Sequence, residues 1–279
     1  MVSAVTTDNV GVKIENALSA LRIGCVRYLN SRPLIEGMSG VRLEHPSILA
    51  SALRAGELDA ALVPVFEVLR APKGQYRLVD GIGICSDGPV YSVFVAHEAE
   101  VGEVDEIVAD PASLTSVHLL QVLGRRVHGR ALNIVAEKDA SLAQFKGARL
   151  LIGNQAIRYR LECERSRPTA RFWDLGEEWS RWTGLPFVYA VWVLSGGIDL
   201  RTSQAAADQF RASAAAGISR RHQIALENSE FPSDFAARYL SDYIRFQVGS
   251  AEKRGLAFFD GELASAGFVP YRDSELEWI

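Results

Sequence analysis

The feature that most constrains the fold is an alternation of short apolar runs with amphipathic segments. Apolar runs cover residues 21–26, 41–45 and 60–64, and helical patterns lie between them near 32–38 and over 47–55. Strands that alternate with helices in this way form βαβ units, in which helices cover a parallel sheet. The first part of the chain is therefore predicted to be an α/β lobe.

A second set of αβ units follows the turn signal Asp87-Gly88-Pro89. The elements predicted there are a crossing strand within 86–98, strands at 107–109, 132–135 and 150–152, helices at 113–123 and 141–145, and a returning strand over 187–194. From about residue 200 onward the pattern is helical, with no comparable strand signal. The predicted architecture is two αβ lobes with a ligand cleft between them and a helical C-terminal portion packed on the first lobe.

The length of the chain, 279 residues, fits two lobes better than one core. Lobe 1 is predicted to be discontinuous, with residues 21–93 and 191–279, and lobe 2 to cover residues 94–190. Residues 1–20 do not resemble a secretory signal and are predicted to be a flexible N-terminal tail. The apolar stretch at 185–194 is too short for a membrane span, which needs about 20 residues. It is predicted to be a central strand.

Composition narrows the class of partner. Lys and Arg total 30 against 34 Asp and Glu, so the net charge of -4 offers no broad basic face for nucleic acid. The three cysteines are odd in number and form no CxxC pair, which favours reduced thiols in the cytoplasm. We therefore expect a cytoplasmic protein with no nucleic-acid or membrane partner. The sequence gives no oligomeric state.

Several reaction classes lack their local signatures. The five histidines form no HExxH pair and have no cysteine cluster nearby, so no metal site is predicted. The chain also has neither a GxSxG elbow nor a GxxxxGK[ST] loop. The stretch "GIGICSDG" at 81–88 begins as GxG but has Ser86 at the third glycine position and runs into a turn, so its glycines are interpreted as loop residues.

The positive signals are hydroxyls and amides at the ends of predicted elements. In "DPASLTSVHLL", Ser113, Thr115 and Ser116 lie at the start of a helix, where free backbone N–H groups and the helix dipole favour an anion. A carboxylate is one candidate ligand for this end. A helix start capped by its own side chains explains the same residues equally well.

Three other junctions carry candidate binding residues. Asn30 stands between a predicted strand and helix and is followed by Arg32, while Gly153-Asn154 ends another strand. Ser92 lies on the predicted crossing strand near the hinge. Helix capping by the two asparagines, a solvated Arg32 and a structural Ser92 are the alternatives. The residue pattern alone supports a two-lobed protein with a cleft that favours anions.

Six blocks of the sequence carry a family resemblance: "RIGCVRYLNSRPL", "HPSILASALRAGELDAALVPVFE", "SDGPVYSV", "LTSVHLL", "LLIGNQAI" and "DLGEEWSRWTGLPFVYAVW". In this order they resemble the chorismate dehydratase family of the futalosine route to menaquinone. The similarity covers about residues 21–260. It implies a type-2 periplasmic-binding-protein-like fold, used inside the cell as an enzyme.

The resemblance also implies a reaction and its residues. Chorismate, a small dianionic substrate, is expected to lose water and give 3-[(1-carboxyvinyl)oxy]benzoate, with no metal or organic cofactor, so the chain is expected to be a hydro-lyase. The family's active-site asparagine matches Asn30 and its hinge-strand serine matches Ser92, which makes these two the expected catalytic residues. Its Thr-Ser pair at the second-lobe helix start matches Thr115 and Ser116, which are expected to bind substrate.

Two departures from the family pattern concern the substrate. Leu114 stands where the family usually has arginine, and Asn154, after Gly153, stands where it usually has aspartate. Gly153, Asn154 and Arg32 are further candidates for substrate binding, the last by long-range attraction of a dianion. The alternatives are a non-catalytic cleft-binding protein for a small anion and a related lyase that acts on another anionic aromatic precursor.

Overall fold

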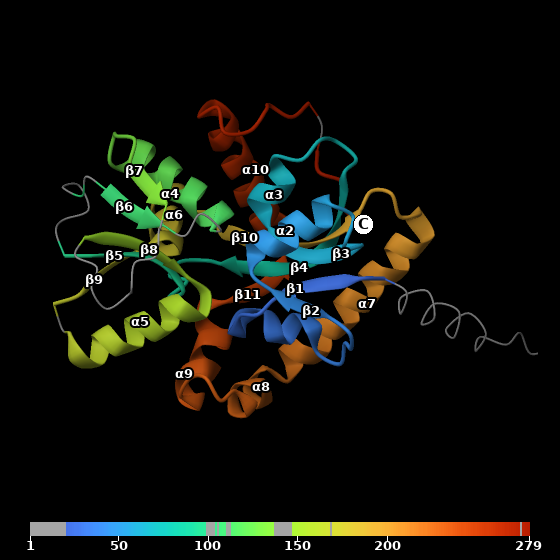
Figure 1. Ribbon diagram of the computed structural model, residues 1–279, viewed down its shortest axis with the longest axis horizontal. Helices are drawn as coiled ribbons and strands as arrows, with labels where there is room; N and C mark the ends of the chain where they lie inside the picture. Colours follow the sequence, from blue (N-terminus) through green and yellow to red (C-terminus); the bar gives the residue numbers. More distant parts are fainter. Residues whose placement is uncertain are drawn as a thin grey trace, which may run out of the picture.

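The chain forms two β-sheets with helices packed on both (Figure 1). The computed structural model describes residues 21–98, 104, 106–109, 113–136, 147–167, 169–273 and 275–279. Two sequence predictions, the tail at 1–20 and the helix at 141–145, lie outside these residues. The predicted α/β class is confirmed.

The larger sheet has six strands in the order β11-β4-β10-β3-β1-β2. Their bounds are β1 (Ile23–Val26), β2 (Arg42–Glu44), β3 (Ala60–Pro64), β4 (Tyr76–Ser86), β10 (Phe187–Ser195) and β11 (Arg245–Val248). β1 runs parallel to β2 and β3, whereas β10 runs antiparallel to β3 and β4. β3 is buried along its whole length, as expected for an apolar run inside a covered sheet.

The smaller sheet has five strands in the order β7-β6-β8-β5-β9. Their bounds are β5 (Val93–His97), β6 (Glu106–Ala109), β7 (Asn133–Ala136), β8 (Ala148–Ile152) and β9 (Arg171–Asp174). β6 pairs in parallel with β7 and β8, and β5 pairs antiparallel with β8 and β9. The predicted lobe boundaries stay a prediction. The strand pairings put β5 in the smaller sheet and all of β10 in the larger one.

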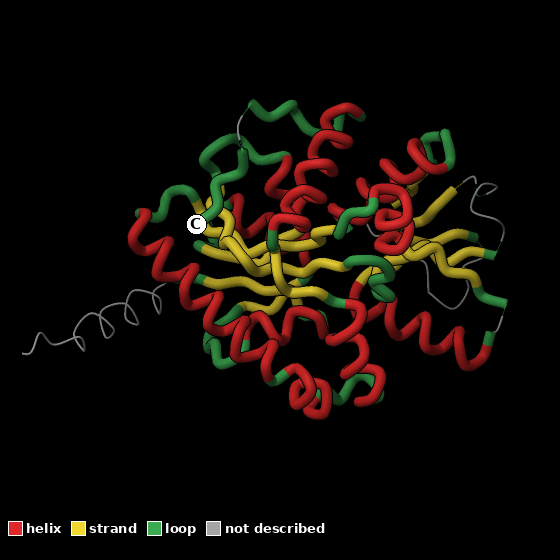
Figure 2. Tube along the Cα trace, turned by 180° about the vertical axis from the view of Figure 1, so that it is seen from behind, coloured by secondary structure: helices red, strands yellow, loops and turns green. Residues whose placement is uncertain are grey.

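Helices flank both sheets (Figures 1 and 2). Their bounds are η1 (Leu29–Ile35, a 3-10 helix), α2 (Pro46–Arg54), α3 (Val65–Leu69), α4 (Leu114–Val127), α5 (Gly153–Ser166), α6 (Leu175–Thr183), α7 (Leu200–Ser219), α8 (Arg221–Glu227), α9 (Ser233–Arg238), η3 (Tyr239–Tyr243, a π turn) and α10 (Ser250–Ser265). α7 contacts η1 and β4, and α10 contacts β10. Within the described ranges, no helix combines the length and apolar character that a membrane crossing requires.

The prediction that the glycines at 81–88 are loop residues is wrong, because β4 runs through most of this stretch. Gly81 has a φ of +85° and Gly83 is paired with Val191 of β10. A Cβ on Gly83 would lie 2.8 Å from the backbone oxygen of Ala190. Glycine is needed here because two central strands approach closely, so these residues are strand residues and not loop residues.

Two helical predictions also need correction. α4 continues beyond Gly124 to Val127, and Gly124 serves instead as the point where the side chain of Leu132 packs directly against the helix. The C-terminal portion is not wholly helical, since β11 pairs antiparallel with β4 at the edge of the larger sheet. β11 has only four residues and lies between helical segments, which hides its pattern in the sequence.

The predicted crossing strand is shorter than expected. β5 begins at Val93, and residues 87–92 form a bent segment in which Tyr91 has a φ of 65°. The backbone N–H groups of Val90 and Tyr91 donate to the carboxylate of Asp174, which replaces strand pairing there. Ser92 therefore lies just before the strand and not on it.

Candidate active site

A pocket with about 590 Å³ of empty space lies between the two sheets, where β1, β3 and β8 end. Its lining includes the polar side chains of Tyr28, Asn30, Ser92, Ser113, Thr115, Ser116 and Tyr189, with Gly153 at one wall. The rest of the lining is mainly apolar and includes Ile84, Val90, Leu114 and Ile152. Among the described residues that line it, none carries a charged side chain. A largely apolar lining with a few polar groups is typical of a small-molecule site.

Asn30 lines this pocket and has an unsatisfied side-chain oxygen. The residue is 7% exposed, and its Nδ2 donates to the hydroxyl of Tyr239 at 3.2 Å. Its Oδ1 is buried and has no hydrogen-bond partner among the described residues. The N-cap of η1 is Tyr28, without a side-chain capping bond, so Asn30 is not a helix cap. A buried carbonyl oxygen without a partner indicates a place where a ligand donor fits.

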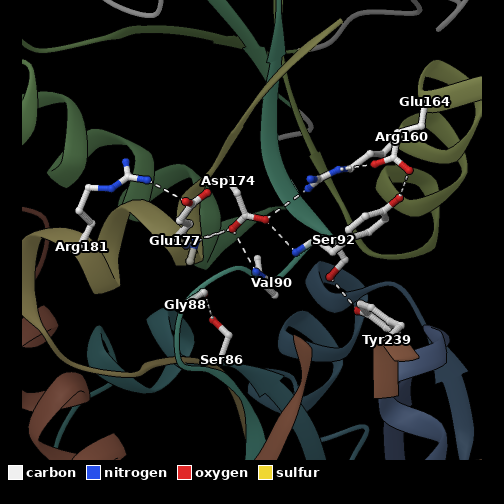
Figure 3. A network of polar contacts seen from close by, with 12 residues as sticks. Ser86, Gly88, Val90, Ser92, Arg160, Glu164, Asp174, Glu177, Arg181 and Tyr239 are labelled. Carbon is white, nitrogen blue, oxygen red and sulfur yellow. Dashed lines mark hydrogen bonds and ion pairs between the residues drawn. The ribbon is translucent and has the colours of Figure 1, made fainter. Parts of the chain in front are cut away.

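Ser92 is tied to the same tyrosine. The hydroxyl of Tyr239 donates to Ser92 Oγ at 2.7 Å, and Figure 3 shows the two side chains facing each other. Burial raises the pKa of Tyr239, although its bonds to Ser92 and Asn30 act in the opposite direction. The phenol is thus neutral near pH 7. Sequence reasoning missed Tyr239, because 209 positions separate it from Asn30 and only the fold brings them together.

The start of α4 contributes a second unsatisfied group. Ser113 is the N-cap residue but makes no side-chain capping bond, and its Oγ is buried without a partner in the described structure. Thr115 behaves differently, because its Oγ1 accepts from the N–H of Phe66 at 3.2 Å and donates to the oxygen of Tyr189 at 3.4 Å. Ser116 is buried and lines the pocket. The interpretation of a self-capped helix start therefore does not hold.

Gly153 and Asn154 hold the two sides of the cleft together. Gly153 has a φ of +62°, and a Cβ there would lie 2.7 Å from the ring of Tyr28. Asn154 accepts from the backbone N–H of Leu29 at 2.8 Å and donates to Glu230 at 2.5 Å. The N-cap of α5 is Ile152, two positions earlier, so Asn154 is not the cap. Its side chain lines neighbouring hollows and not the pocket itself.

Arg32 is exposed and does not line the pocket. It borders a separate surface depression together with Glu36 and Asn154. The structure thus brings five of the seven predicted site residues to one pocket, namely Asn30, Ser92, Thr115, Ser116 and Gly153. Asn154 lies at its edge and Arg32 outside it.

The segment that leads into Ser92 is fixed by a buried carboxylate. Asp174 accepts from the N–H groups of Val90, Tyr91, Gly176 and Glu177 at 2.8 to 3.1 Å (Figure 3). Burial raises the pKa of Asp174, although these N–H groups and Arg160 lower it in part. These bonds join the crossing segment to the start of α6 and so fix the position of Ser92.

Arg160 of α5 completes this arrangement. Its guanidinium lies 4.1 Å from the centre of the Tyr91 ring and 3.5 Å from Asp174 Oδ2. Glu164, one turn further along α5, accepts from both Arg160 and the Tyr91 hydroxyl. We call Tyr91, Arg160, Glu164 and Asp174 the crossing cluster. It supports the left-handed backbone of Tyr91, a conformation that a bulky residue adopts only when its surroundings impose it.

Comparison with known proteins places this geometry in context. The family model described as menaquinone biosynthesis matches residues 21–264. A chorismate dehydratase of Thermus thermophilus is 30% identical over 186 residues, which are 61% of this chain and 68% of that protein. One of Campylobacter jejuni is 28% identical over 167 residues, or 58% of each chain, so the match spans less than two thirds of that relative.

Solved structures show the same fold at lower identity. A protein from Archaeoglobus fulgidus has a TM-score of 0.70 and 16% identity, with 89% of this chain and 98% of that chain covered. The alkanesulfonate-binding protein of Xanthomonas axonopodis pv. citri, bound to MOPS, has a TM-score of 0.62 and 14% identity over 92% of this chain and 96% of that one. The predicted two-lobed periplasmic-binding-protein-like fold is thereby confirmed.

Proposed function

The chain belongs to the menaquinone biosynthesis family whose model it matches, and from that premise we propose that it is a chorismate dehydratase. The product is then 3-[(1-carboxyvinyl)oxy]benzoate. The observation that carries the proposal is the unpartnered Oδ1 of Asn30, a residue that lines an uncharged pocket together with Ser92 and the start of α4. This set suits a ring that carries a carboxylate and a hydroxyl group.

The start of α4 is proposed to hold one carboxylate of chorismate. Ser113 Oγ has no partner within the described residues, and Ser116 lines the same wall. These hydroxyls, the first N–H groups of α4 and the helix dipole together favour an anion without a charged side chain. Leu114, which stands where the family usually has arginine, lines the pocket with an apolar surface. Neutral donors therefore carry the whole task of binding this carboxylate.

The Asn30 and Ser92 pair is proposed to hold the C4 hydroxyl of the ring. Asn30 Oδ1 accepts a hydrogen bond from this hydroxyl group, and Ser92 Oγ donates a hydrogen bond to its oxygen. No histidine or carboxylate lines the pocket in the described structure, so the lining offers no general base of the usual kind. The enolpyruvyl carboxylate of the substrate is proposed to take the C3 proton.

The proposed reaction balances without a further reactant. The C3–H bond breaks, its electron pair forms the C3=C4 bond, and the C4–O bond breaks as the ring becomes aromatic. The departing hydroxide takes the proton now held by the enolpyruvyl carboxyl group and leaves as water. The product is strongly favoured by aromaticity, so the protein contributes chiefly orientation and stabilisation of the charge that develops on the leaving oxygen.

Incubation of the purified protein with chorismate tests the proposal. We expect a product lighter by one water, with an aromatic absorbance, and no product with heat-denatured protein. Binding of chorismate without water loss contradicts the proposal and favours a cleft-binding protein, a role compatible with the fold of the alkanesulfonate-binding protein. If the protein neither binds chorismate nor removes water from it, the result favours a lyase that acts on another anionic aromatic precursor.

A further inference from the structure

We propose that Tyr239 is a positioning residue that fixes the direction of the hydrogen bonds at Asn30 and Ser92. This inference rests on the proposed function, since it explains how the pair receives the leaving hydroxyl. Tyr239 does not line the pocket, so it acts through its two neighbours and not by contact with substrate.

The direction follows from the number of protons available. A neutral phenol carries one proton, and Tyr239 donates it to Ser92 Oγ at 2.7 Å. Its oxygen then accepts from Asn30 Nδ2 at 3.2 Å. Burial raises the pKa of Tyr239, which keeps the phenol protonated and preserves this order.

The consequence is a matched pair of groups at the pocket. Because Asn30 Nδ2 is held by Tyr239, Oδ1 is turned away from the phenol and remains the unpartnered acceptor. Because Ser92 already accepts from Tyr239, its own proton is available to donate to a ligand. A hydroxyl group is both a donor and an acceptor, so it satisfies the two groups together. Hydrogen bonds in such a chain also polarise one another.

The ring of Tyr239 is held independently of its hydroxyl. It stacks on Phe235 at 5.9 Å between ring centres and lies 6.5 Å from Tyr243. The residue begins the π turn η3, a feature that often occurs at functional sites. Since these contacts involve the ring, replacement by phenylalanine removes the hydroxyl while the packing is retained.

The first experiment compares Tyr239→Phe with Tyr243→Phe, a matched change on the same turn. No hydrogen bond from the Tyr243 hydroxyl is recorded among the described residues. We expect Tyr239→Phe to lower kcat about 10- to 100-fold with KM changed less than about threefold. Tyr243→Phe should retain wild-type kinetics. Wild-type kcat in Tyr239→Phe overturns the inference.

A double-mutant cycle separates positioning from general structural support. If Tyr239 acts through Asn30 and Ser92, its loss should cost less than about twofold in kcat once Asn30→Ala and Ser92→Ala are present. The same 10- to 100-fold loss in that background would show a role independent of the pair and contradict the inference.

A measurement without substrate distinguishes this inference from the proposed function. The side-chain amide protons of Asn30, assigned by NMR through their absence in Asn30→Ala, should exchange slowly with water in the wild type and clearly faster in Tyr239→Phe. Equal exchange rates in the two proteins refute the hydrogen-bond order. If wild-type protein does not dehydrate chorismate but the exchange rates differ as expected, the proposed function fails and the hydrogen-bond order stands.

Discussion

Two neighbouring buried polar regions of this molecule differ in whether their polar atoms have hydrogen-bond partners. In the crossing cluster, Asp174 accepts hydrogen bonds from four backbone N–H groups and lies beside Arg160. At the pocket, Asn30 Oδ1 and Ser113 Oγ are buried with no partner in the described part of the chain. Both regions contact the same short segment, residues 87–92, whose last residue is Ser92.

Polar groups that have partners hold the backbone of the site in place, whereas polar groups without partners are available to bind a ligand. A satisfied buried network rigidifies its surroundings, whereas an unsatisfied buried group is costly unless something fills its place. The crossing cluster thus fixes the backbone at Ser92, and the pocket leaves specific positions for a ligand. Substitutions in the first region should affect stability, and those in the second should affect turnover.

The largest expected effect comes from Asn30→Ala. Loss of the amide should lower kcat about 10²- to 10³-fold, as for the loss of one preorganised group that stabilises developing charge. The melting temperature should fall by no more than a few degrees, because the folded protein loses the hydrogen bond from Asn30 Nδ2 to Tyr239, worth about 1 kcal/mol, while the unsatisfied oxygen contributes no bond. Kinetics with chorismate and thermal unfolding check both parts. Near-wild-type turnover would remove Asn30 from the mechanism and break the comparison.

Asp174→Asn should reduce stability more than any substitution at the pocket. The asparagine nitrogen would face the N–H of Tyr91, and Arg160 would lose its buried anion, at a cost of about 1–3 kcal/mol in the free energy of unfolding. Urea denaturation measures this change. Asp199→Asn is the control, because Asp199 caps α7 on the surface and asparagine caps as well as aspartate. Equal losses at both sites would contradict the special role of the cluster.

Ser113→Ala and Thr115→Val sharpen the comparison within a single helix start. Ser113→Ala should raise the KM for chorismate about tenfold, equivalent to about 1.4 kcal/mol, with stability unchanged. Thr115→Val should instead lower the free energy of unfolding by about 1 kcal/mol, because the N–H of Phe66 loses its acceptor. Steady-state kinetics and urea denaturation of both variants test this division. A reversed pattern would contradict it.

The smallest effect is expected for Arg32→Ala, which lies outside both regions. At low salt, kcat/KM of the variant should be lower than that of the wild type by less than about threefold. This difference should disappear at high salt, because salt screens the long-range attraction of a dianion. Arg201→Ala, an exposed arginine at the start of α7, is the control. A loss that persists at high salt would indicate that Arg32 contacts the substrate.

Much of the fold could be predicted because the apolar runs follow simple periods. β3 and β10 read as buried strands and lie in the middle of the larger sheet. β4 was missed because its glycines serve close strand packing, a cause that appears only when the neighbouring strand is known. The bend before Ser92 was missed because the carboxylate that imposes it, Asp174, lies more than eighty residues further along the chain.

The candidate site was predictable to a similar extent. Asn30, Ser92 and Ser116 could be named from junctions and from the family resemblance, and all three line the pocket. Local sequence cannot tell whether a hydroxyl at a helix start is free or bound, which is why Ser113 and Thr115 read alike. Tyr239 carries no local signal, since its two partners come from other parts of the chain.

The bridge made by Asn154 has a consequence for the timing of catalysis. Its side chain joins α5 to the N–H of Leu29 and to Glu230, so both bonds must break before that edge of the pocket can open. Glu230 is also held by Arg158 from the same helix. Opening of this edge is therefore a conformational step that is distinct from any bond-making or bond-breaking in the ligand. If the protein is the dehydratase proposed above, we expect the rate of product release to depend on Asn154, a residue that lies outside the lining of the pocket.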